Sequence, residues 1–401
     1  MTPQIETLIH RLRAERNEPV CAYIYDLTQL RAHIAQIVTT LPRQCRFFYA
    51  IKANSQAPIL RALAPYVHGY EVASQGELEK VRAISADVPI IFGGPGKTEA
   101  ELAVAIRQGA KLLHVESAQE LDRIQYLGAA MGKEIPILLR VNLRGLLPAA
   151  TLKMSGVATQ FGIDEIELPD LITQALRSRN IMVQGFHFHS ISNNLDAVAH
   201  AQLIDSYIAR AHAWSAEYRI NLSYLNVGGG IGVNYAELDR QFAWDIFVQE
   251  LNQVLNGYDL PGLTLLFECG RYVTAACGYY AAEVLDIKQN HATYYVIVRG
   301  GTHHFRLPVS WQHSHPFIVI SMEDWSYPFP RRAIERVNVT IVGQLCTPKD
   351  RLAFDAFVSR VRIGDVILFC YTGAYGWAIS HHDFLSHPKP EQIFIGDWAD
   401  Q

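Results

Sequence analysis

Short apolar runs alternate with amphipathic stretches over the middle of the chain, from about Cys45 to Arg271. The eight apolar runs are CRFFYAI, GYEVA, PIIFG, KLLHV, PILLRVN, VQGFHF, YLNVG and LTLLFE. Stretches such as SQGELEKVRAI, KTEAELAVAIRQ and SAQELDRIQYLGAAM have helical spacing. Strands that alternate with helices predict parallel βαβ units. A count of eight favours a closed (β/α)8 TIM-like barrel, which typically takes ~250 residues, over an open doubly wound sheet.

After Arg271 the pattern changes to strands with little helix between them. The segments YVIVRG, PFIVISM, VNVTIVGQL and DVILFCYTG predict a mostly β domain. CAYIYD, near the N-terminus, is a further strand that can pair with this sheet. We therefore expect a barrel domain at residues 31–271 and a discontinuous β-rich domain made of residues 1–30 and 272–401.

Composition places the chain among globular proteins, because 49% of its 401 residues are hydrophobic and 18% are charged. The net charge of −4, with no basic run, argues against nucleic acid as a partner. No segment reaches the ~18 unbroken apolar residues of a membrane span, and the N-terminus lacks an apolar signal core. The six cysteines show no short paired spacing, which predicts reduced thiols in a cytoplasm.

Polar residues and glycines gather where the predicted strands end, which is where a barrel of this kind carries its chemistry. They are Lys52, Glu71, Ser74, Gly93, Gly94, Glu116, Arg140, Asn142, His187, His189, Gly228 to Gly230, Glu268 and Arg271. Lys52, at the end of FFYAIK, has two interpretations. Burial statistics favour an ordinary rim charge by roughly three to one. The alternative is a Schiff-base lysine, which needs a partly desolvated pocket to lower its pKa.

Three other motifs also have two interpretations each. NVGGGIG is either a tight turn or a phosphate cradle, and it is no dinucleotide fingerprint because Val233 stands at the sixth position. FECGR is either a surface ion pair or a carboxylate and guanidinium that hold a cofactor ring nitrogen and a phosphate. The histidines of FHFHS and HHDFLSH can ligate metals, but the first pair has no acidic or third histidine ligand nearby in sequence. We therefore expect no metal: the chance that these histidines bind one is about one in ten.

Together these motifs resemble those of the fold-type III pyridoxal-phosphate decarboxylases, the family of ornithine and diaminopimelate decarboxylases. YAIKAN, GFHFHSIS, NVGGGIG, FECGR, GQLCTPKD and GAYG follow the family's order over nearly the whole chain. FGGPGKT, HFHSISNNLD, GGTHHFRLPVSWQH and AYGWAISHHDFLSHP are most similar to the siderophore-biosynthetic decarboxylases of staphyloferrin B-type pathways. The resemblance implies pyridoxal 5'-phosphate as cofactor and an alanine racemase-like fold, with the barrel followed by a β domain.

The resemblance also implies a role for each matching residue of the barrel. Lys52 would hold the cofactor, His189 would stack on its ring, and Glu268 would bond the pyridinium nitrogen and keep it protonated. The residues that would bind the cofactor phosphate are Ser192, Gly228, Gly229, Gly230, Arg271 and Tyr375.

Three residues would act on the substrate. Cys346 would protonate the α-carbon, and its segment would reach the neighbouring subunit's site in an obligate head-to-tail homodimer. Without the resemblance, the sequence indicates only a small buried apolar residue at Cys346. Asp350 occupies the position of a substrate contact in the family. Arg306 suits a substrate carboxylate, because guanidinium binds carboxylate through two hydrogen bonds.

The chain departs from the family pattern at three places. Ile191 replaces a glycine before the phosphate-binding serine, and Cys269 replaces a proline in FECGR. CTPKD differs from the acidic, glycine-containing version of diaminopimelate decarboxylases, which weakens that assignment.

We therefore expect an α-decarboxylase that converts citryl-diaminopropionate to citryl-ethylenediamine and CO2. The alternatives are a decarboxylase of free diaminopimelate, lysine, ornithine or arginine, an amino-acid racemase on the same barrel, and a non-catalytic homologue that binds partners or stores cofactor. A racemase needs an acid-base residue opposite Lys52, and the thiol of Cys346 fits decarboxylation better. Retention of Lys52, Glu268 and Cys346 argues against the non-catalytic alternative.

Overall fold

The protein is described by a computed structural model covering residues 3–145, 152–154 and 156–396. The chain divides into two compact units. One comprises Arg31–Asn234 and Arg240–Val273, and the other comprises Met1–Leu30, Tyr235–Asp239 and Thr274–Gln401. Each unit is described in turn below.

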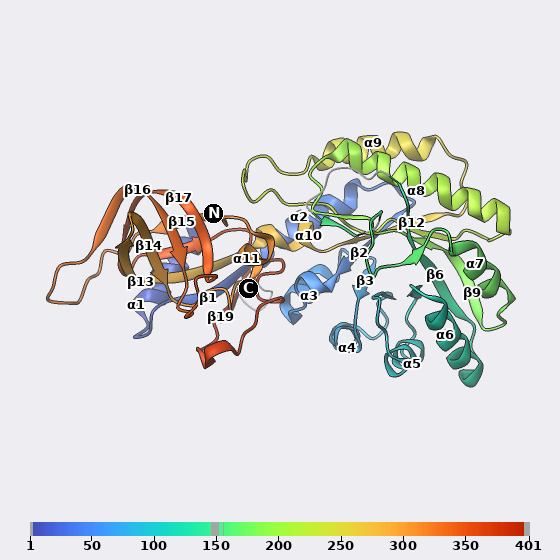
Figure 1. Ribbon diagram of the computed structural model, residues 1–401, viewed down its shortest axis with the longest axis horizontal. Coiled ribbons are helices and arrows are strands. Elements are labelled where there is room, and N and C mark those ends of the chain that lie inside the picture. The colour runs from blue at the N-terminus through green and yellow to red at the C-terminus, as the bar shows by residue number, and fades with distance from the viewer. Residues whose placement is uncertain (1–2, 146–151, 155, 397–401) are drawn as a thin grey trace. The chain divides into compact units, whose positions relative to one another are not determined.

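In the first unit, eight parallel strands among the described residues close into a barrel (Figure 1). Each strand pairs with the next, and β12 pairs back with β2, so the sheet has no open edge within this ring. The strands in spatial order are β2 (Cys45–Ala50), β3 (Gly69–Val72), β4 (Ile90–Phe92), β5 (Leu112–Val115), β6 (Ile135–Asn142), β9 (Ile181–His187), β11 (Tyr224–Asn226) and β12 (Thr264–Cys269). The eight predicted strands and their closure are thereby confirmed, and the doubly wound alternative is excluded.

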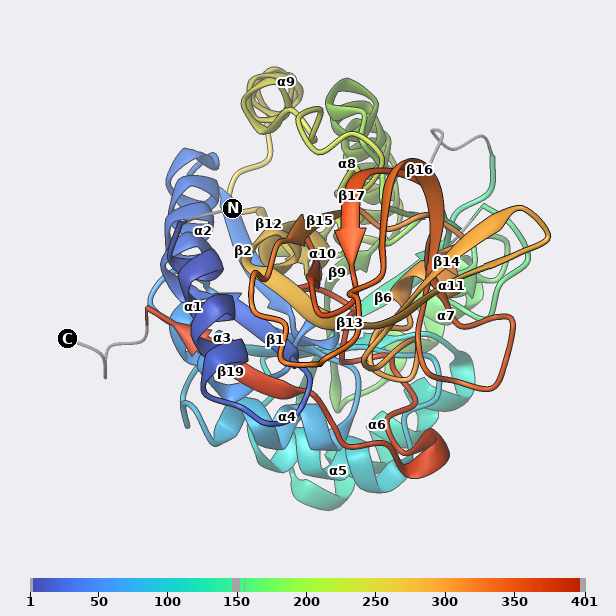
Figure 2. The same cartoon turned by 90° about the vertical axis from the view of Figure 1, so that its left-hand side faces the viewer.

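Helices connect the barrel strands and lie around them (Figure 2). They are α3 (Ala57–Leu63), α4 (Gln75–Arg82), α5 (Glu99–Arg107), α6 (Ala118–Met131), α7 (Leu168–Arg177), α8 (Ala197–Tyr218) and α9 (Trp244–Asn256). Hydroxyl groups cap several N-termini: Ser74 accepts from the Glu77 amide, and Ser117 from the Glu120 amide. Ser74, one of the polar residues at the predicted strand ends, therefore starts a helix.

The barrel interior is filled by side chains. Phe48, Ile91, Leu112, Leu138 and Leu266 form one buried cluster and come from five different strands. Branched and aromatic side chains packed inside the ring make the barrel a core and not a pore. Chemistry in this unit is therefore confined to the ends of the strands.

The second unit is built on a sheet in the order β15-β18-β13-β14-β16-β17, with β1 joined to β13 and β19 joined to β1. CAYIYD forms β1 and pairs antiparallel with β13, Cys21 opposite Ala282, which confirms the predicted pairing with the C-terminal sheet. The strands are β1 (Cys21–Asp26), β13 (Gly278–Asn290), β14 (Thr293–Val298), β15 (Phe317–Ile320), β16 (Ala333–Val342), β17 (Arg351–Arg362), β18 (Val366–Phe369) and β19 (Glu391–Ile395).

Helix α1 (Pro3–Ala14) covers one face of this second sheet. Its buried residues Ile5, Leu8, Ile9 and Leu12 join Ile24, Ala281 and Leu368 in one apolar cluster. The spacing of the four helical residues is that of a single apolar stripe, so burial of that stripe holds the helix to the sheet.

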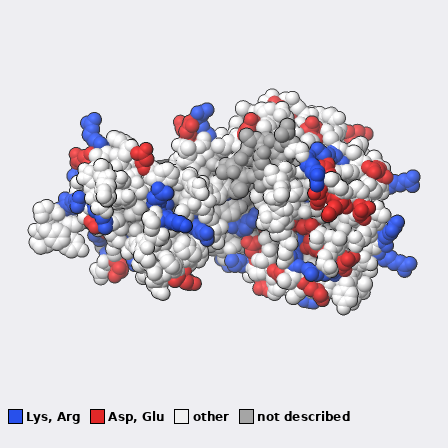
Figure 3. Space-filling model, in the orientation of Figure 1, with Lys and Arg blue, Asp and Glu red and all other residues white. Residues whose placement is uncertain are grey.

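The short segment Tyr235–Asp239 belongs to the β-rich unit, where the Tyr235 and His313 rings stack with their centroids 5.0 Å apart. The expected division at residues 31 and 271 placed this segment in the barrel domain. The idea that residues 31 and 271 are the boundaries of independently folding domains stays a prediction. Among the described residues, no helix is both long and apolar enough to cross a membrane. Basic and acidic side chains are intermixed on the face drawn in Figure 3.

Candidate active site

Lys52 follows directly on strand β2, in the single helical turn Ile51–Ala53. Its Nζ lies 2.9 Å and 3.2 Å from the two carboxylate oxygens of Glu71, at the end of β3. Parallel pairing explains the meeting, because Ala50 is opposite Glu71 in the β2–β3 register. The Lys52 side chain is 43% exposed and that of Glu71 only 5%. The chain itself thus holds the amine at the rim beside a buried carboxylate.

The turn that carries Lys52 packs against the FECGR segment. A Cβ atom added at Gly270 would lie 2.8 Å from the Ala53 Cβ and 2.9 Å from the Ala50 carbonyl oxygen. A side chain at this position would therefore displace the lysine turn. Arg271 follows at the start of α10 (Arg271–Thr274) and is buried.

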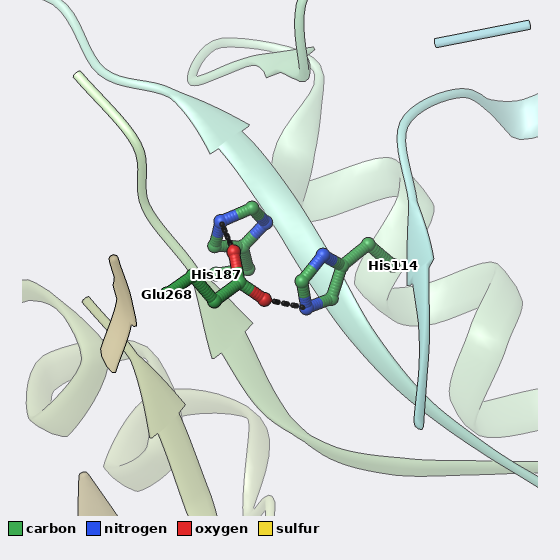
Figure 4. A group of neighbouring side chains, drawn as sticks. All are labelled: His114, His187 and Glu268. Carbon is green, nitrogen blue, oxygen red and sulfur yellow. Dashed lines mark ion pairs between the residues drawn. The ribbon is translucent and has the colours of Figure 1, made fainter. Parts of the chain in front are cut away.

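Glu268, near the end of β12, is the buried carboxylate at the centre of the site. The Asn226 side-chain amide donates to its Oε1 at 2.6 Å. Nε2 of His114 lies 3.6 Å from Oε1, and Nε2 of His187 lies 3.4 Å from Oε2 (Figure 4). Burial first, and the negative charge of Glu71 second, raise the pKa of Glu268 to about 8. This carboxylate is therefore poised to ionise when a cation lies beside it.

His114 and His187 form a stacked pair, with ring centroids 3.8 Å apart and planes inclined by 26°. Burial is the main cause that lowers the pKa of both rings well below the usual value, so both are neutral at pH 7. Together with Glu268 they are the one group of potential metal ligands among the described residues. We expected no acidic residue and no third histidine near His187, and this expectation is wrong, because Glu268 and His114 both lie beside it in the folded chain.

The geometry of this group nevertheless disfavours a metal. A histidine nitrogen offers its lone pair in the plane of the ring, so two nearly parallel rings direct their lone pairs side by side. A zinc ion needs lone pairs that converge on one point ~2.0–2.1 Å away. The arrangement suits a neutral pair that surrounds Glu268, and the absence of a metal stays a prediction.

His189 lies two residues beyond His187 and has a defined tautomer. Its Nδ1 accepts a hydrogen bond from the Gly229 amide at 3.1 Å, so the proton of the neutral ring is on Nε2. Burial first, and the charges of Lys52 and Arg140 next, lower the pKa of His189 well below the usual value. The ring is therefore neutral, as suits stacking on a cofactor.

The glycine loop connects these groups to β11. The Asn226 Oδ1 accepts from the Gly228 amide at 2.9 Å, so one side chain holds both Glu268 and the loop. Gly228 and Gly230 have φ of +70° and +87°, and a Cβ added at Gly229 would lie 2.2 Å from the Glu268 carbonyl oxygen. The amides of Gly228 and Gly229 donate hydrogen bonds to side chains of the same chain, namely Asn226 and His189. Of the three glycine amides, that of Gly230 is therefore the candidate to bind an anion.

Ser192 lies on the two-residue strand β10 (Ile191–Ser192). Ile191, which replaces the family's glycine, is buried within this strand, and its φ is not positive. A glycine's conformational freedom is therefore not needed here, and the substitution is compatible with the local backbone.

A second buried network supports the rim of the barrel. Arg140 donates to Glu116 at 2.6 Å, and Glu116 also accepts from the amides of Gly94 and Gly162. Glu116, Arg140 and Gly94 stand at ends of the predicted strands, and the structure shows them bonded to one another.

The remaining predicted residues lie in the β-rich unit. Cys346 is exposed. Arg306 is exposed and directly precedes helix α11 (Leu307–Trp311). Tyr375 is partly buried and has a positive φ of 54°.

Asp350 has an environment that the sequence did not predict. It is 1% exposed, and its carboxylate accepts from the amide and hydroxyl of Thr302 at 2.6 Å and 2.8 Å and from the Leu345 amide at 2.9 Å. Both oxygens are thus used within the chain. This favours a role in fastening loops over the expected substrate contact, which stays a prediction.

The histidines of HHDFLSH do not form a metal-ligand group among the described residues. His382 stacks on Trp377 at 3.5 Å and bonds the Trp377 carbonyl through Nε2. His387 lies 5.2 Å from His303, ring centroid to ring centroid.

Sequence reasoning assigned no role to Glu71, His114 or Asn226, although all three contact the central groups. His114 and Asn226 are polar residues inside the apolar runs KLLHV and YLNVG. A polar side chain that interrupts a buried barrel strand is the signal that would have identified them.

Comparison with known proteins gives consistent results. Residues 27–275 match the family model described as pyridoxal-dependent decarboxylase, pyridoxal binding domain. A protein of Staphylococcus aureus named 2-[(L-alanin-3-ylcarbamoyl)methyl]-2-hydroxybutanedioate decarboxylase is 50% identical over 98% of both chains. The L-glutamyl-[BtrI acyl-carrier protein] decarboxylase of Niallia circulans is 32% identical over 92% of this chain and 87% of the relative.

Among solved structures, diaminopimelate decarboxylase from Helicobacter pylori, complexed with L-lysine, superposes with a TM-score of 0.84. It is 26% identical, and the match covers 96% of this chain and 94% of that one. The barrel and the mostly β unit therefore have counterparts in an experimentally determined decarboxylase.

Proposed function

Because the chain belongs to the pyridoxal-dependent decarboxylase family, we propose that it decarboxylates citryl-diaminopropionate in siderophore biosynthesis. The observation that carries this proposal is the 50% identity, over 98% of both chains, to the Staphylococcus aureus decarboxylase. The name of that relative's substrate describes citrate joined through an amide to the 3-amino group of 2,3-diaminopropionate. Loss of the alanyl carboxyl group from that compound gives citryl-ethylenediamine and CO2.

The residues of the barrel fit pyridoxal 5'-phosphate. A primary amine stands at the rim, and the Glu268 carboxylate is buried with a raised pKa. The adjacent glycine loop has no room for a side chain at Gly229. When bound, pyridoxal phosphate supplies an electron sink for the electron pair that CO2 leaves behind.

Lys52 is proposed to hold the cofactor and to release the product. The Glu71 carboxylate lies within hydrogen-bond distance of the Lys52 amine and forms an ion pair with it. We propose that Glu71 takes and returns the proton that the amine must lose before it reacts.

Glu268 is proposed to bond the ring nitrogen of the cofactor. Burial raises the pKa of this carboxylate, and a protonated ring nitrogen beside it would counter that effect and favour the ionised form. The Asn226 amide holds Glu268 by a hydrogen bond, and the neutral rings of His114 and His187 lie beside it at 3.6 Å and 3.4 Å. We propose that His189 stacks on the ring and that Ser192, the Gly230 amide, Arg271 and Tyr375 bind the phosphate.

Cys346 is proposed to deliver a proton to the α-carbon in a neighbouring subunit of a head-to-tail homodimer. Its exposure supports this, because a thiol that acts on another chain must reach the surface of its own. All six cysteines are free thiols, as suits the proposed cytoplasmic location.

Arg306 is proposed to bind a carboxylate of the substrate through two hydrogen bonds. Asp350, with its oxygens bonded to Thr302 and Leu345, is proposed to hold the loops around it.

Product analysis tests the proposal. The purified enzyme is incubated in parallel with citryl-diaminopropionate, diaminopimelate, ornithine, lysine and arginine, and the products are identified by mass spectrometry. Loss of CO2 from the citryl compound alone is expected. Turnover of a free diamino acid instead would keep the chemistry and discard the substrate.

A further inference from the structure

The β-rich unit contains a cationic hollow of about 700 Å³. One wall comes from the turn and helix after β14, with Thr302, Arg306 and Ser310. The other comes from the loop that leads into β17, with Thr347, Lys349 and Arg351. A volume of this size is typical of sites for small molecules.

The three cations of this hollow are not paired with acids. Within the part of the chain that the structure describes, no carboxylate forms an ion pair with Arg306, Lys349 or Arg351. By contrast, Arg360, on the same strand as Arg351, pairs with Glu335 at 3.2 Å. Three like charges around one hollow repel one another, so an anion bound between them relieves that repulsion.

The other titratable groups at the hollow do not cancel this charge. His381 also lines it, and burial first and the Arg306 charge second lower the pKa of His381, so it is neutral at pH 7. The nearby Asp350 carboxylate bonds Thr302 on one wall and Leu345 on the other. Asp350 thus links the two walls, and both of its carboxylate oxygens accept hydrogen bonds from Thr302 and Leu345 and, within the described part of the chain, from no cation of the hollow.

We propose that this hollow binds the citryl end of the substrate, with Arg306 on one carboxylate and Lys349 and Arg351 on the other. The hydroxyl groups of Thr302, Ser310 and Thr347 are the partners for the tertiary hydroxyl of the citryl group. This inference rests on the proposed function and deepens it, because it names the residues that recognise the part of the substrate that does not react.

The position of these cations in the chain gives the inference a mechanistic consequence. Lys349 and Arg351 follow Cys346 by three and five residues. One segment thus carries both the proposed proton donor and the citryl anchors. In the proposed homodimer this hollow therefore serves the neighbouring subunit's site, as Cys346 does, and binding energy from the remote carboxylates orients the α-carbon toward the thiol. A free diamino acid lacks the citryl carboxylates and gains none of this orientation.

Steady-state kinetics of the holoenzyme test the inference. The variants are Arg306→Gln, Lys349→Gln and Arg351→Gln, each measured with citryl-diaminopropionate and with free 2,3-diaminopropionate. Each neutralisation is expected to lower kcat/KM for the citryl substrate about 10- to 100-fold, since a hydrogen bond to a charged group contributes that much. The preference for the citryl substrate over free 2,3-diaminopropionate, measured as the ratio of the two kcat/KM values, is therefore expected to fall. Arg360→Gln is the matched control and is expected to match the wild type.

Binding of citrate, measured by calorimetry, separates this inference from the proposed function. Citrate is expected to bind the wild type, to bind each variant more weakly, and to lose affinity as salt is added. Tricarballylate, which lacks the hydroxyl, is expected to bind less tightly than citrate.

Two outcomes would overturn the subsite. One is turnover of the citryl substrate with an unchanged kcat/KM in Lys349→Gln and Arg351→Gln. The other is binding of inorganic phosphate as tight as that of citrate, which would reveal a general anion patch. If citrate binding depends on these cations but the citryl substrate is not decarboxylated, the subsite stands and the proposed function fails.

Discussion

At the scale of single residues, the site is organised around one buried carboxylate. Asn226 gives Glu268 a short hydrogen bond, while the neutral rings of His114 and His187 approach it at longer distances. No basic side chain forms a short ion pair with Glu268 among the described residues. Its charge is therefore left for a cofactor to balance.

Glu268 should make the cofactor-free protein less stable as pH rises. Its pKa is about 8 in the folded chain, against an ordinary value of 4.5, so the folded state binds the proton more tightly between these values. Its contribution is fully present below about pH 4.5 and is lost as pH rises through about 8. Urea unfolding of Glu268→Gln from pH 5 to 8.5 should show a smaller loss of stability than the wild type. Glu335→Gln, at an exposed site, should follow the wild type, and equal slopes in all three proteins would contradict the prediction.

Asn226 should matter for both stability and cofactor retention. Asn226→Ala removes the donor to Glu268 and leaves the Gly228 amide without its acceptor. Unpaired buried polar groups cost about 1–3 kcal/mol each, so a clear loss of unfolding free energy is expected. The absorbance of bound pyridoxal phosphate after dialysis should also fall. Asn338→Ala, which removes an exposed bond to Asp355, serves as the control and should change neither quantity.

At the scale of elements, the ends of neighbouring parallel strands bring distant residues together. Lys52 meets Glu71 because β2 pairs with β3, and Glu268 meets Asn226 because β12 pairs with β11. The glycine loop after β11 passes so close to the backbone of β12 that no side chain fits at Gly229.

Gly229→Ala should therefore disrupt the loop. Its Cβ would lie 2.2 Å from the Glu268 carbonyl oxygen, and backbone cannot yield as a flexible side chain can. Overpacking of this kind costs about 1–3 kcal/mol, measurable as a lower melting temperature together with weaker cofactor retention. Gly76→Ala, in helix α4 with open space around the position, should instead stabilise the protein by roughly 0.5–1 kcal/mol. A normal melting temperature for Gly229→Ala would show that the loop can shift.

At the scale of the whole molecule, the proposed residues fall on two compact units, with Lys52 in the barrel and Cys346 in the β-rich unit. The proposed homodimer joins these units from different chains. Its consequence is that two inactive variants can restore one intact site between them.

Mixing Lys52→Ala with Cys346→Ala subunits should restore activity. Random exchange puts one intact site in each mixed dimer, which gives about a quarter of the wild-type activity. Mixing Lys52→Ala with Glu268→Gln should restore nothing, because both residues belong to the barrel of the same chain. Activity that stays at background in the first mixture, with subunit exchange verified, would contradict a shared site.

The sequence by itself determined the architecture of the barrel, the family and most of the proposed cofactor residues. Hydrophobic periodicity reports which face of an element is buried, and eight alternating units close one ring of strands. Motifs such as YAIKAN and FECGR are local, so Lys52, Glu268 and Arg271 were visible without coordinates. Even for β1, far from its sheet in sequence, the apolar run CAYIYD indicated a strand that can pair with the C-terminal sheet.

Only the tertiary structure decided which side chains meet. His114 and Glu268 are far apart in the chain, and no local pattern shows that they lie 3.6 Å apart. Asp350 looked available for substrate until its oxygens were seen bonded to Thr302 and Leu345. The same holds for Arg306 and Arg351, which come from different elements and line one hollow. The physical reason is that periodicity encodes burial within one element, whereas contacts between elements depend on strand register and loop paths through space.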